Sequence, residues 1–419
     1  MAILLSDVNN ALKKVLLPYI QDNFDKEHLL LDNIKRGDVT FINNTFYAPV
    51  RTSRHGGVTN LANDGSTLVN GSSSIGQASV NTKIVTGTFD ISDLVIKATK
   101  SKEGAVESLL TQQASTLADD FAKGLNRQYY SDGVGVVAMV AGSTSATVMT
   151  VSYPTSAVDD GRSIDWYGTV NNDLKAAKYI QPGNYIGVGS AASGSAIVLS
   201  VSHNATGATG TVTTSGDPTA TANDPVYIID GAYAGAGTSE IQGVRAALSS
   251  SSGTSTYAGL ARSTDGWTPQ LGTTAQALTL SEMTDKYIGA LEYSKAGDRF
   301  VILMNKTLYS KYGKILTAMR RTVDETELIG GFSGLQFVAG RGKVGVFLDF
   351  DVPDGEVEII NLDTWQSCQV DPMEWLEDPS TGSLVRRPDK ITYQATMVWY
   401  TNLMCLAPAA NARLTQKTA

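Results

Sequence analysis

The sequence predicts an α+β protein that carries a separate, β-rich module inserted in its chain. Three observations predict this class. A long amphipathic helix pattern covers residues 103–132, a charge-poor stretch of short strand patterns covers 134–237, and mixed strand and helix patterns follow from residue 241 to the end. With 419 residues and a hydrophobic fraction of 42%, the chain is long enough for two or three domains with buried cores.

The helix over 103–132 has the most regular pattern in the chain. Its apolar residues recur at steps of three and four, which places them on one face: Val106, Leu110, Ala114, Leu117, Phe121, Leu125 and Tyr129. The opposite face is polar and carries Glu107, Gln112, Ser115, Asp119, Lys123, Asn126 and Gln128. Ser101 is a suitable N-cap and Gly133 a suitable stop. We therefore expect a single rod of roughly 45 Å.

An extended hairpin is expected before this helix. Residues 1–24 first form a short amphipathic helix pattern that Pro18 interrupts. Residues 51–82 are rich in Gly, Ser, Asn and Thr and contain no aromatic residue, so they bury little surface. The alternating run 84–96 reads as a strand. The alternative for 51–82 is a disordered surface loop.

The stretch 134–237 is expected to form a small antiparallel barrel or sandwich. Turn signals such as Pro182-Gly183 separate short strand patterns, at Thr147–Val151, Tyr185–Val188, Ala196–Val201, Thr209–Thr213 and Val226–Ile229. Its composition differs from both flanks, which indicates an inserted domain.

Helices and strands are mixed beyond residue 241. Thr279 and Glu282 form a capping box, and Asn305 is placed to cap a second helix. Further strands are expected at Arg299–Met304, Leu335–Val338, Val344–Phe350, Val357–Ile360 and Ile391–Cys405. The last of these is long enough to lie along the helix 103–132, and we expect it to cover the apolar face of that helix.

Charge and cysteine content limit the classes of function. The net charge of −8 and the pI near 5.0 argue against a basic surface that grips nucleic-acid phosphates. No apolar run is long enough for a membrane helix, and the N-terminus lacks the order of a signal peptide. Two cysteines cannot form a disulfide framework, so we expect synthesis in a reducing cytoplasm.

Catalytic and metal-binding signals are weak. His28, His55 and His203 have no zinc-site spacing, and the loose dinucleotide pattern at 187–192 precedes a strand where a helix is needed. The acids at Asp349, Asp351 and Asp354 resemble a calcium loop, but their spacing and strand flanks favour a turn. We therefore predict no enzyme activity, no metal and no cofactor.

Charged residues are candidates for contacts between copies of the chain. The pair Arg320 and Arg321 lies beside Asp324, Glu325 and Glu327; the alternative for this group is a solvated face. The predicted assembly contacts are Arg51, Arg54, Arg320, Arg321 and Glu325.

The order of these features resembles the major capsid proteins of tailed bacteriophages with the Hong Kong 97-type fold. The similarity covers most of the chain outside 134–237. The sequence segments that carry the similarity are 255–264 (STYAGLARST) followed by Trp267, 331–337 (GFSGLQF), 352–355 (VPDG), 362–365 (LDTW) and 407–414 (APAANARL). The glycine-rich 51–82 resembles the extended loop of that family, and 103–132 its spine helix.

The resemblance implies a shell subunit that forms hexamers and pentamers of an icosahedral head around double-stranded DNA. Implied partners are a separate scaffolding protein, a portal and, optionally, a decoration protein, with no membrane and no sequence-specific DNA contact. The protein would be made in the host bacterial cytoplasm and reside in the virion. The implied domains are an N-terminal arm (1–50), an extended loop hairpin (51–100), the spine helix (101–133), the inserted domain (134–237), an axial domain (238–365) and the second part of the peripheral domain (366–419).

Two expectations concern processing. The 102 residues before Glu103 leave no room for a large fused scaffolding segment, so we expect a separate scaffold. Some family members crosslink a lysine of the extended loop to an asparagine. Lys83, the only lysine near this loop, sits at its base, so we expect no crosslinks and no subunit ladder on a denaturing gel.

Two other functions are open. An encapsulin-like nanocompartment shell resembles the minimal fold, and the β-rich insertion argues against it. A carbohydrate-binding or adhesin β-protein would need exposed aromatic residues near acids or amides, and 134–237 offers Trp166 beside Asp165.

Overall fold

The fold is taken from a computed structural model of the chain. It describes residues 29–37, 39–58, 60, 70–94, 103–133, 135–145, 147–152, 157–159, 162–164, 177–189, 194–203, 209–228, 240–249, 255–318, 326–327, 333–340, 342–353, 355–377, 383–387 and 390–418. The expected N-terminal helix and the Ser101 cap lie outside these residues. The chain is mixed α+β, with more strand than helix, as the sequence predicts.

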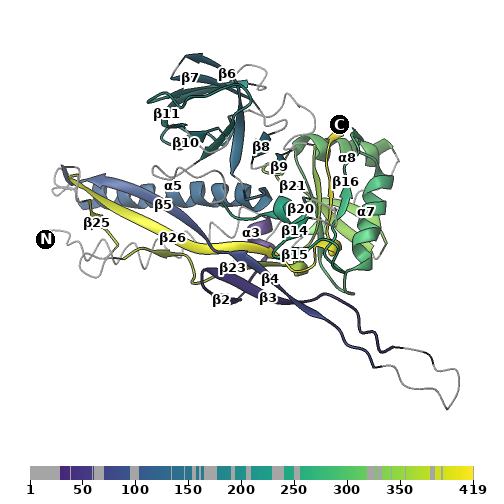
Figure 1. The fold of residues 1–419 in the computed structure, drawn as a ribbon. Coiled ribbons are helices and arrows are strands. Elements are labelled where there is room, and N and C mark those ends of the chain that lie inside the picture. The colour runs from purple at the N-terminus through teal and green to yellow at the C-terminus, as the bar shows by residue number, and fades with distance from the viewer. Residues whose placement is uncertain are drawn as a thin grey trace.

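One long helix, α5 (Glu103–Tyr130), lies against a long sheet (Figure 1). The central strand of that sheet is β26 (Thr392–Cys405), which has 14 residues. One edge of β26 pairs with β5 along ten residues, and its other edge pairs in turn with three short strands. The strands around β26 are β1 (Lys35–Gly37), β5 (Lys83–Ser92), β23 (Trp365–Gln369), β24 (Glu374–Trp375) and β25 (Val385–Arg386).

The apolar face of α5 meets β5. A Cβ added to Gly87 of β5 would lie 3.1 Å from Phe121 Cδ2 and 3.2 Å from Leu117 Cδ1, so the glycine allows the helix to approach. The expected strand 391–405, observed as β26, lies beside β5 in the same sheet, and its Ala395, Met397 and Trp399 belong to the same buried core as Phe121 and Leu125 of the helix. Of the predicted stripe, Ala114, Phe121, Leu125 and Tyr129 are buried and Leu117 is partly buried. Ala118 and Ala122, which were not predicted, are buried as well.

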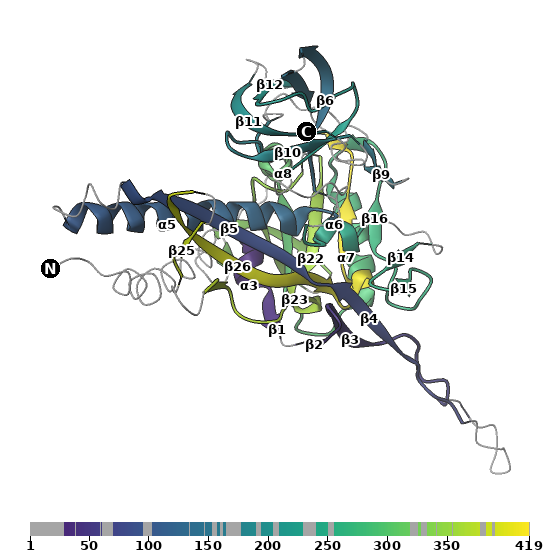
Figure 2. The same cartoon turned by 60° about the vertical axis from the view of Figure 1, so that its left-hand side comes forward.

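A hairpin projects from the body (Figures 1 and 2). Its strands β3 (Thr45–Arg51) and β4 (Ile75–Asn81) pair over seven residues, and β2 (Thr40–Ile42) pairs with β3. Asn43 and Asn44 join β2 to β3 with positive φ angles of 49° and 63°, as a two-residue turn of type I′ requires. The strands expected on either side of 51–82 are therefore placed differently: the hairpin arms are 45–51 and 75–81, and the run expected as a strand at 84–96 overlaps β5, which pairs with β26.

A closed six-stranded barrel follows the helix in the chain (Figure 2). Of the two forms expected for this stretch, the structure has the barrel, with an apolar interior that includes Val140, Val151, Ile186, Val198 and Val226. The strands are β6 (Val136–Ser145), β7 (Val148–Ser152), β10 (Tyr185–Val188), β11 (Gly194–His203), β12 (Thr209–Thr214) and β13 (Pro225–Ile228). A separate pair is formed by β8 (Ala157–Asp159) and β9 (Arg162–Ile164).

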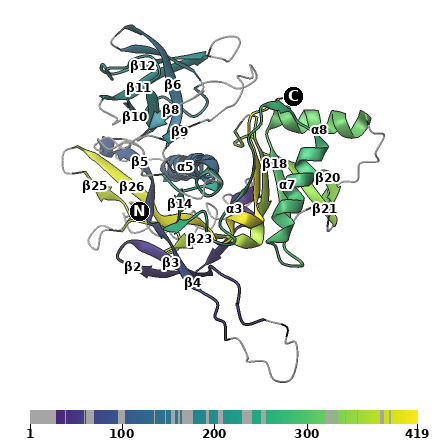
Figure 3. The same cartoon turned by 45° about the vertical axis from the view of Figure 1, so that its right-hand side comes forward.

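A seven-stranded sheet with two helices forms the third part of the molecule (Figure 3). Its strands in order are β16 (Gln270–Gly272), β27 (Ala412–Leu414), β22 (Val357–Asn361), β18 (Phe300–Met304), β21 (Gly342–Leu348), β20 (Ser333–Ala339) and β19 (Thr326–Glu327). The helices are α7 (Leu280–Glu292) and α8 (Lys306–Ala318), and they share one apolar core with the sheet. Both predicted caps are present: Thr279 Oγ1 accepts from Glu282 N at 3.4 Å, and Asn305 Oδ1 accepts from Leu308 N at 3.2 Å.

Short elements connect these parts. They are α3 (Leu29–Asn33), α6 (Val244–Ala247), β14 (Thr256–Tyr257), β15 (Leu260–Ala261), β17 (Gln276–Ala277), β28 (Lys417–Thr418) and the 3-10 helices η2 (Leu362–Thr364) and η3 (Pro408–Ala410). After the long strand β26, the chain crosses over and adds β27 to the seven-stranded sheet. The C-terminal residues therefore tie the two sheets together.

Candidate functional site: contact surfaces and two buried charged junctions

Arg51, at the outer end of the β3–β4 ladder, and Arg54, beyond it, are exposed. Arg51 ends β3, and its Nε donates to the carbonyl of Ser53 at 3.0 Å. Arg54 keeps 78% of its side chain exposed and lies 3.7 Å from Asp265. The structure does not bring these arginines together with the other predicted contacts, because Arg320, Arg321 and Glu325 lie outside the described residues. A role in contacts between copies stays a prediction.

The hairpin leaves the body beside the loop 255–267, in which Tyr257, Arg262 and Trp267 are buried. Ser79 N of β4 donates to Ala258 O at 2.9 Å. In the loop itself, Trp267 Nε1 donates to Tyr257 O at 2.9 Å, and the Arg262 guanidinium lies 5.0 Å from the Tyr257 ring centre. The sequence of this loop, 255–267, is one of the segments that resemble the capsid family. Its packing fixes the direction in which the hairpin projects.

A charged junction joins the last turns of α5 to the barrel. Arg127 and Glu240, both nearly buried, form an ion pair, with Nη1 to Oε2 at 3.1 Å. Burial alone would lower the pKa of Arg127, but attraction to Glu240 raises it. The ring of Tyr179, from the barrel, lies 5.6 Å from the Arg127 guanidinium. The pair therefore holds together the two chain segments that enter and leave the barrel.

The same junction reaches the turn after β21. Lys178 Nζ donates to Asp351 Oδ1 at 2.9 Å and to Phe350 O at 2.7 Å, and Asn126 Nδ2 donates to Asp351 Oδ2 at 2.9 Å. Burial would raise the pKa of Asp351, but Lys178 and the hydrogen bonds hold it below its usual value. The sequence around Asp349 and Asp351 resembles a calcium loop. In the structure, the ammonium group of Lys178 lies against oxygens of this turn.

Neighbouring groups complete this network. Tyr130 OH donates to Asp349 Oδ2 at 2.8 Å. Burial and the nearby charge of Asp351 raise the pKa of Asp349. The turn that the sequence favours at 349–351 is present, and Asp354 lies outside the described residues. Asn126, expected on the polar outer face of the helix, is fully buried here because the acids of this turn need donors. That expectation is corrected.

A second charged cluster lies between α6, β22 and β27. Arg413 Nε lies 3.1 Å from Glu356 Oε2 and 3.2 Å from Glu358 Oε1, and Arg245 Nη2 lies 3.3 Å from Glu356 Oε1. All four side chains are buried. Burial and the neighbouring Glu356 raise the pKa of Glu358 to about 8, although Arg413 opposes the shift. Two arginines and two acids here link the C-terminal strand to the sheet.

The raised pKa of Glu358 predicts a pH dependence of stability. An unfolded chain releases this proton near the ordinary value of 4.5, whereas the folded protein retains it up to about 8. The free energy of unfolding should therefore fall as pH rises through this window. In Glu358→Gln, which cannot titrate, this component is absent. Urea unfolding of both proteins at about pH 5 and about pH 8 measures the difference; parallel pH profiles would contradict the assignment.

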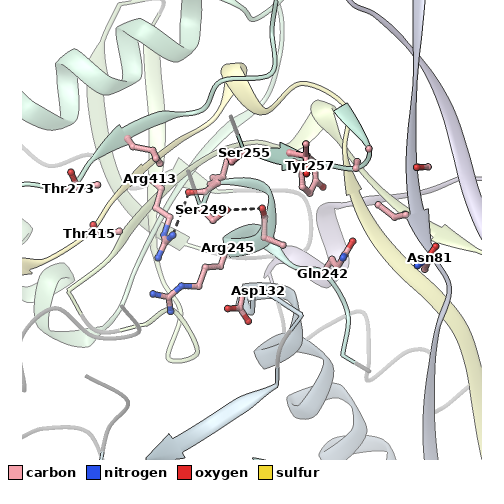
Figure 4. A pocket seen from close by; sticks show the side chains of 18 residues that line it. Asn81, Asp132, Gln242, Arg245, Ser249, Ser255, Tyr257, Thr273, Arg413 and Thr415 are labelled. Carbon is pink, nitrogen blue, oxygen red and sulfur yellow. Dashed lines mark hydrogen bonds between the residues drawn. The ribbon is translucent and has the colours of Figure 1, made fainter. Parts of the chain in front are cut away.

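A cavity of about 730 Å³ opens next to this cluster (Figure 4). Arg245, Arg413 and Asp132 lie on one side of it, and Ser255 and Tyr257 on another. Arg413 is already bound to Glu356, and its Nη1 donates to Leu248 O at 3.5 Å. The cavity thus lies where the helix, the hairpin and the C-terminal strand converge.

Both cysteine side chains are buried. Burial raises the pKa of both cysteine thiols, Cys368 and Cys405, to about 12, so neither is a thiolate near neutral pH. Within the described ranges, no group of three or more His, Cys, Asp and Glu side chains is arranged to hold a metal ion. No helix in the described part of the chain is long and apolar enough to span a membrane.

The roles of most of these polar residues were not predicted from the sequence. Arg127 and Lys178 look like ordinary surface residues, and Glu240 and Glu356 stand in loops or at strand starts. The only local signal was the acid-rich turn at 349–351. Pairs such as Arg127 and Glu240, 113 residues apart, could be found only from the fold.

Comparison with known proteins places the fold. No protein-family model and no curated protein match the sequence. A chain of the Cyanophage A-1(L) capsid is similar over 93% of this chain and 93% of its own, with a TM-score of 0.51 and 14% identity. A satellite phage P4 procapsid chain is similar over 97% and 99% (TM-score 0.40, 8% identity), and an encapsulin from Synechococcus elongatus over 36% and 53% (TM-score 0.28, 16% identity). The first similarity shows that the chain has the fold of that phage capsid chain.

Proposed function

We propose that this chain is the major capsid protein of a tailed bacteriophage, with a Hong Kong 97-type fold and an inserted barrel, and that its role is structural. The observation that carries the proposal is the similarity to the cyanophage capsid chain over 93% of both chains. The segments 255–267 and 407–414, whose sequences resemble the family, support the proposal, since both lie at junctions between parts of the fold.

The proposed domains follow the architecture. Helix α5 with the long sheet around β26 corresponds to the peripheral domain, and the seven-stranded sheet with α7 and α8 to the axial domain. The projecting β3–β4 hairpin corresponds to the extended loop, and the barrel to the insertion. One boundary differs from the sequence-based assignment of 366–419 to the peripheral domain, because β27 and β28 pair with strands of the axial region.

Assembly would proceed through many modest contacts repeated around closed symmetry. Axial domains would meet around the centre of each hexamer or pentamer, and the hairpin would reach a neighbouring copy. A net charge of −8 suits a wall that encloses DNA without holding it tightly. We propose a separate scaffolding protein, a portal and a decoration protein as partners, synthesis in the bacterial cytoplasm and residence in the virion.

Sedimentation of the purified protein tests the proposal. We expect capsomers or shells of many copies when the chain is expressed in bacteria, alone or together with a scaffolding protein from the same genome. A chain that stays monomeric at high concentration under both conditions would overturn it.

A further inference from the structure

Among the described residues, one edge of β5 pairs with no strand, and it presents a defined set of backbone groups. Asp93 N donates to Ile391 O at 3.2 Å, just beyond the ladder in which Ser92 faces Thr392 and Lys83 faces Thr401. Because the direction of N–H and C=O groups alternates along a strand, the odd-numbered residues of β5 bond to β26. The even-numbered ones point to the opposite edge.

Bonds on the far side of β26 support this assignment. Val370 N donates to Tyr400 O at 3.1 Å and Leu376 N to Thr396 O at 2.8 Å, so the even residues of β26 point away from β5. In the part of the chain that the structure describes, no strand pairs with the outer edge of β5. The groups on that edge belong to Ile84, Thr86, Thr88, Asp90 and Ser92, which span roughly 27 Å.

This edge has few of the features with which proteins block strand pairing. It contains no proline, and its ladder with β26 has no bulge. The side chains at 84, 86 and 88 are exposed and uncharged, and the single acid, Asp90, lies 3.1 Å from Arg387 Nη1. The face beside it is partly apolar, since Ile84 (59% exposed) lies in register with Tyr400 (36%). A long, regular edge whose one acid, Asp90, lies beside Arg387 is a template for another strand.

We propose that this edge hydrogen-bonds to a strand of a second copy of the chain in the assembled shell, so that the long sheet continues from one subunit into the next. The inference rests on the proposed function. A shell subunit meets its own copies at high local concentration, which makes a copy the natural occupant, and main-chain pairing tolerates small changes of angle between neighbours. The outer edge of β5 is then an assembly interface distinct from Arg51 and Arg54.

Hydrogen exchange of the backbone amides tests this directly. In unassembled subunits the amides of Val85, Gly87 and Phe89 should be protected, and those of Thr86, Thr88 and Asp90 should exchange quickly. In purified particles both sets should be protected. Mass spectrometry with fragmentation that preserves the label, applied to the peptide covering 83–92, separates the two sets. Fast exchange of the even amides in intact particles would overturn the inference while leaving the proposed function standing; absence of any particle would overturn both.

A matched pair of variants provides a second test. Thr86→Pro removes an outward N–H that pairs with no strand in the described part of the chain, and edge strands tolerate such a proline. Thr86→Ala changes the side chain and keeps the N–H. Both should melt like the wild type, and Thr86→Pro should raise the subunit concentration needed for assembly by roughly tenfold, as the loss of one or two net backbone hydrogen bonds predicts. Equal assembly of the folded Pro and Ala variants would contradict the pairing.

Discussion

Replacing Phe121 with aspartate is expected to unfold the subunit and to abolish its assembly. The Phe121 ring is only 7% exposed and lies over Gly87, where helix and strand approach closely. The change removes a large apolar contact and buries a carboxylate, for a combined cost of several kcal/mol. A typical domain has only ~5–15 kcal/mol of stability, so most of the margin is lost. Urea unfolding followed by circular dichroism measures the effect.

Gln113→Asp is the matched control for this variant. It introduces the same charge on the same helix, but Gln113 is exposed. We expect its free energy of unfolding to stay within about 0.5 kcal/mol of the wild type, as for most surface substitutions. If Phe121→Asp gave soluble subunits that assemble normally, the helix would present a different face to β5.

Replacing Arg413 with methionine is expected to destabilise the protein by about 3–5 kcal/mol, the usual cost of breaking a buried ion pair from one side. The substitution leaves Glu356 and Glu358 buried beside each other, with Arg245 as the remaining cation of the cluster. Because β27 carries Arg413 into the sheet, the C-terminal strand should loosen first. Urea unfolding gives the total loss, and amide exchange of residues 412–418 shows where it occurs.

Two further variants interpret the Arg413→Met result. Arg386→Met removes an exposed arginine and should have little effect. The triple variant Arg413→Met, Glu356→Gln and Glu358→Gln removes both buried acids and should recover part of the loss, because the stranded negative charge is gone. An Arg413→Met protein as stable as Arg386→Met would show that the cluster contributes nothing.

The elements with a strong local pattern were predictable from the sequence. The strands at 300–304, 357–361 and 392–405 were found because buried or alternating apolar residues mark them, and the two caps because Thr279 and Asn305 stand before helical patterns. The hairpin was found from composition. Five of the six barrel strands were also expected near their observed places.

Features set by distant contacts were not predictable. β6 (Val136–Ser145) was missed because its apolar run does not alternate and follows the helix almost at once. Asn126 was placed on the wrong face because its hydrogen-bond partners, Asp349 and Asp351, lie more than 220 residues away. The close approach of α5 to β5 was not predictable, because Gly87, which permits it, leaves no apolar signal. The crossing of the chain from β26 to β27 likewise has no local pattern.

Electron cryomicroscopy of the purified assembly tests the central claim most directly. We expect closed icosahedral shells in which each subunit shows helix α5 lying on β5, the hairpin extending onto a neighbour, and the seven-stranded sheets gathered around the capsomer centres. Particles built from a different subunit fold, or a preparation that contains only monomers with and without scaffolding protein, would contradict it.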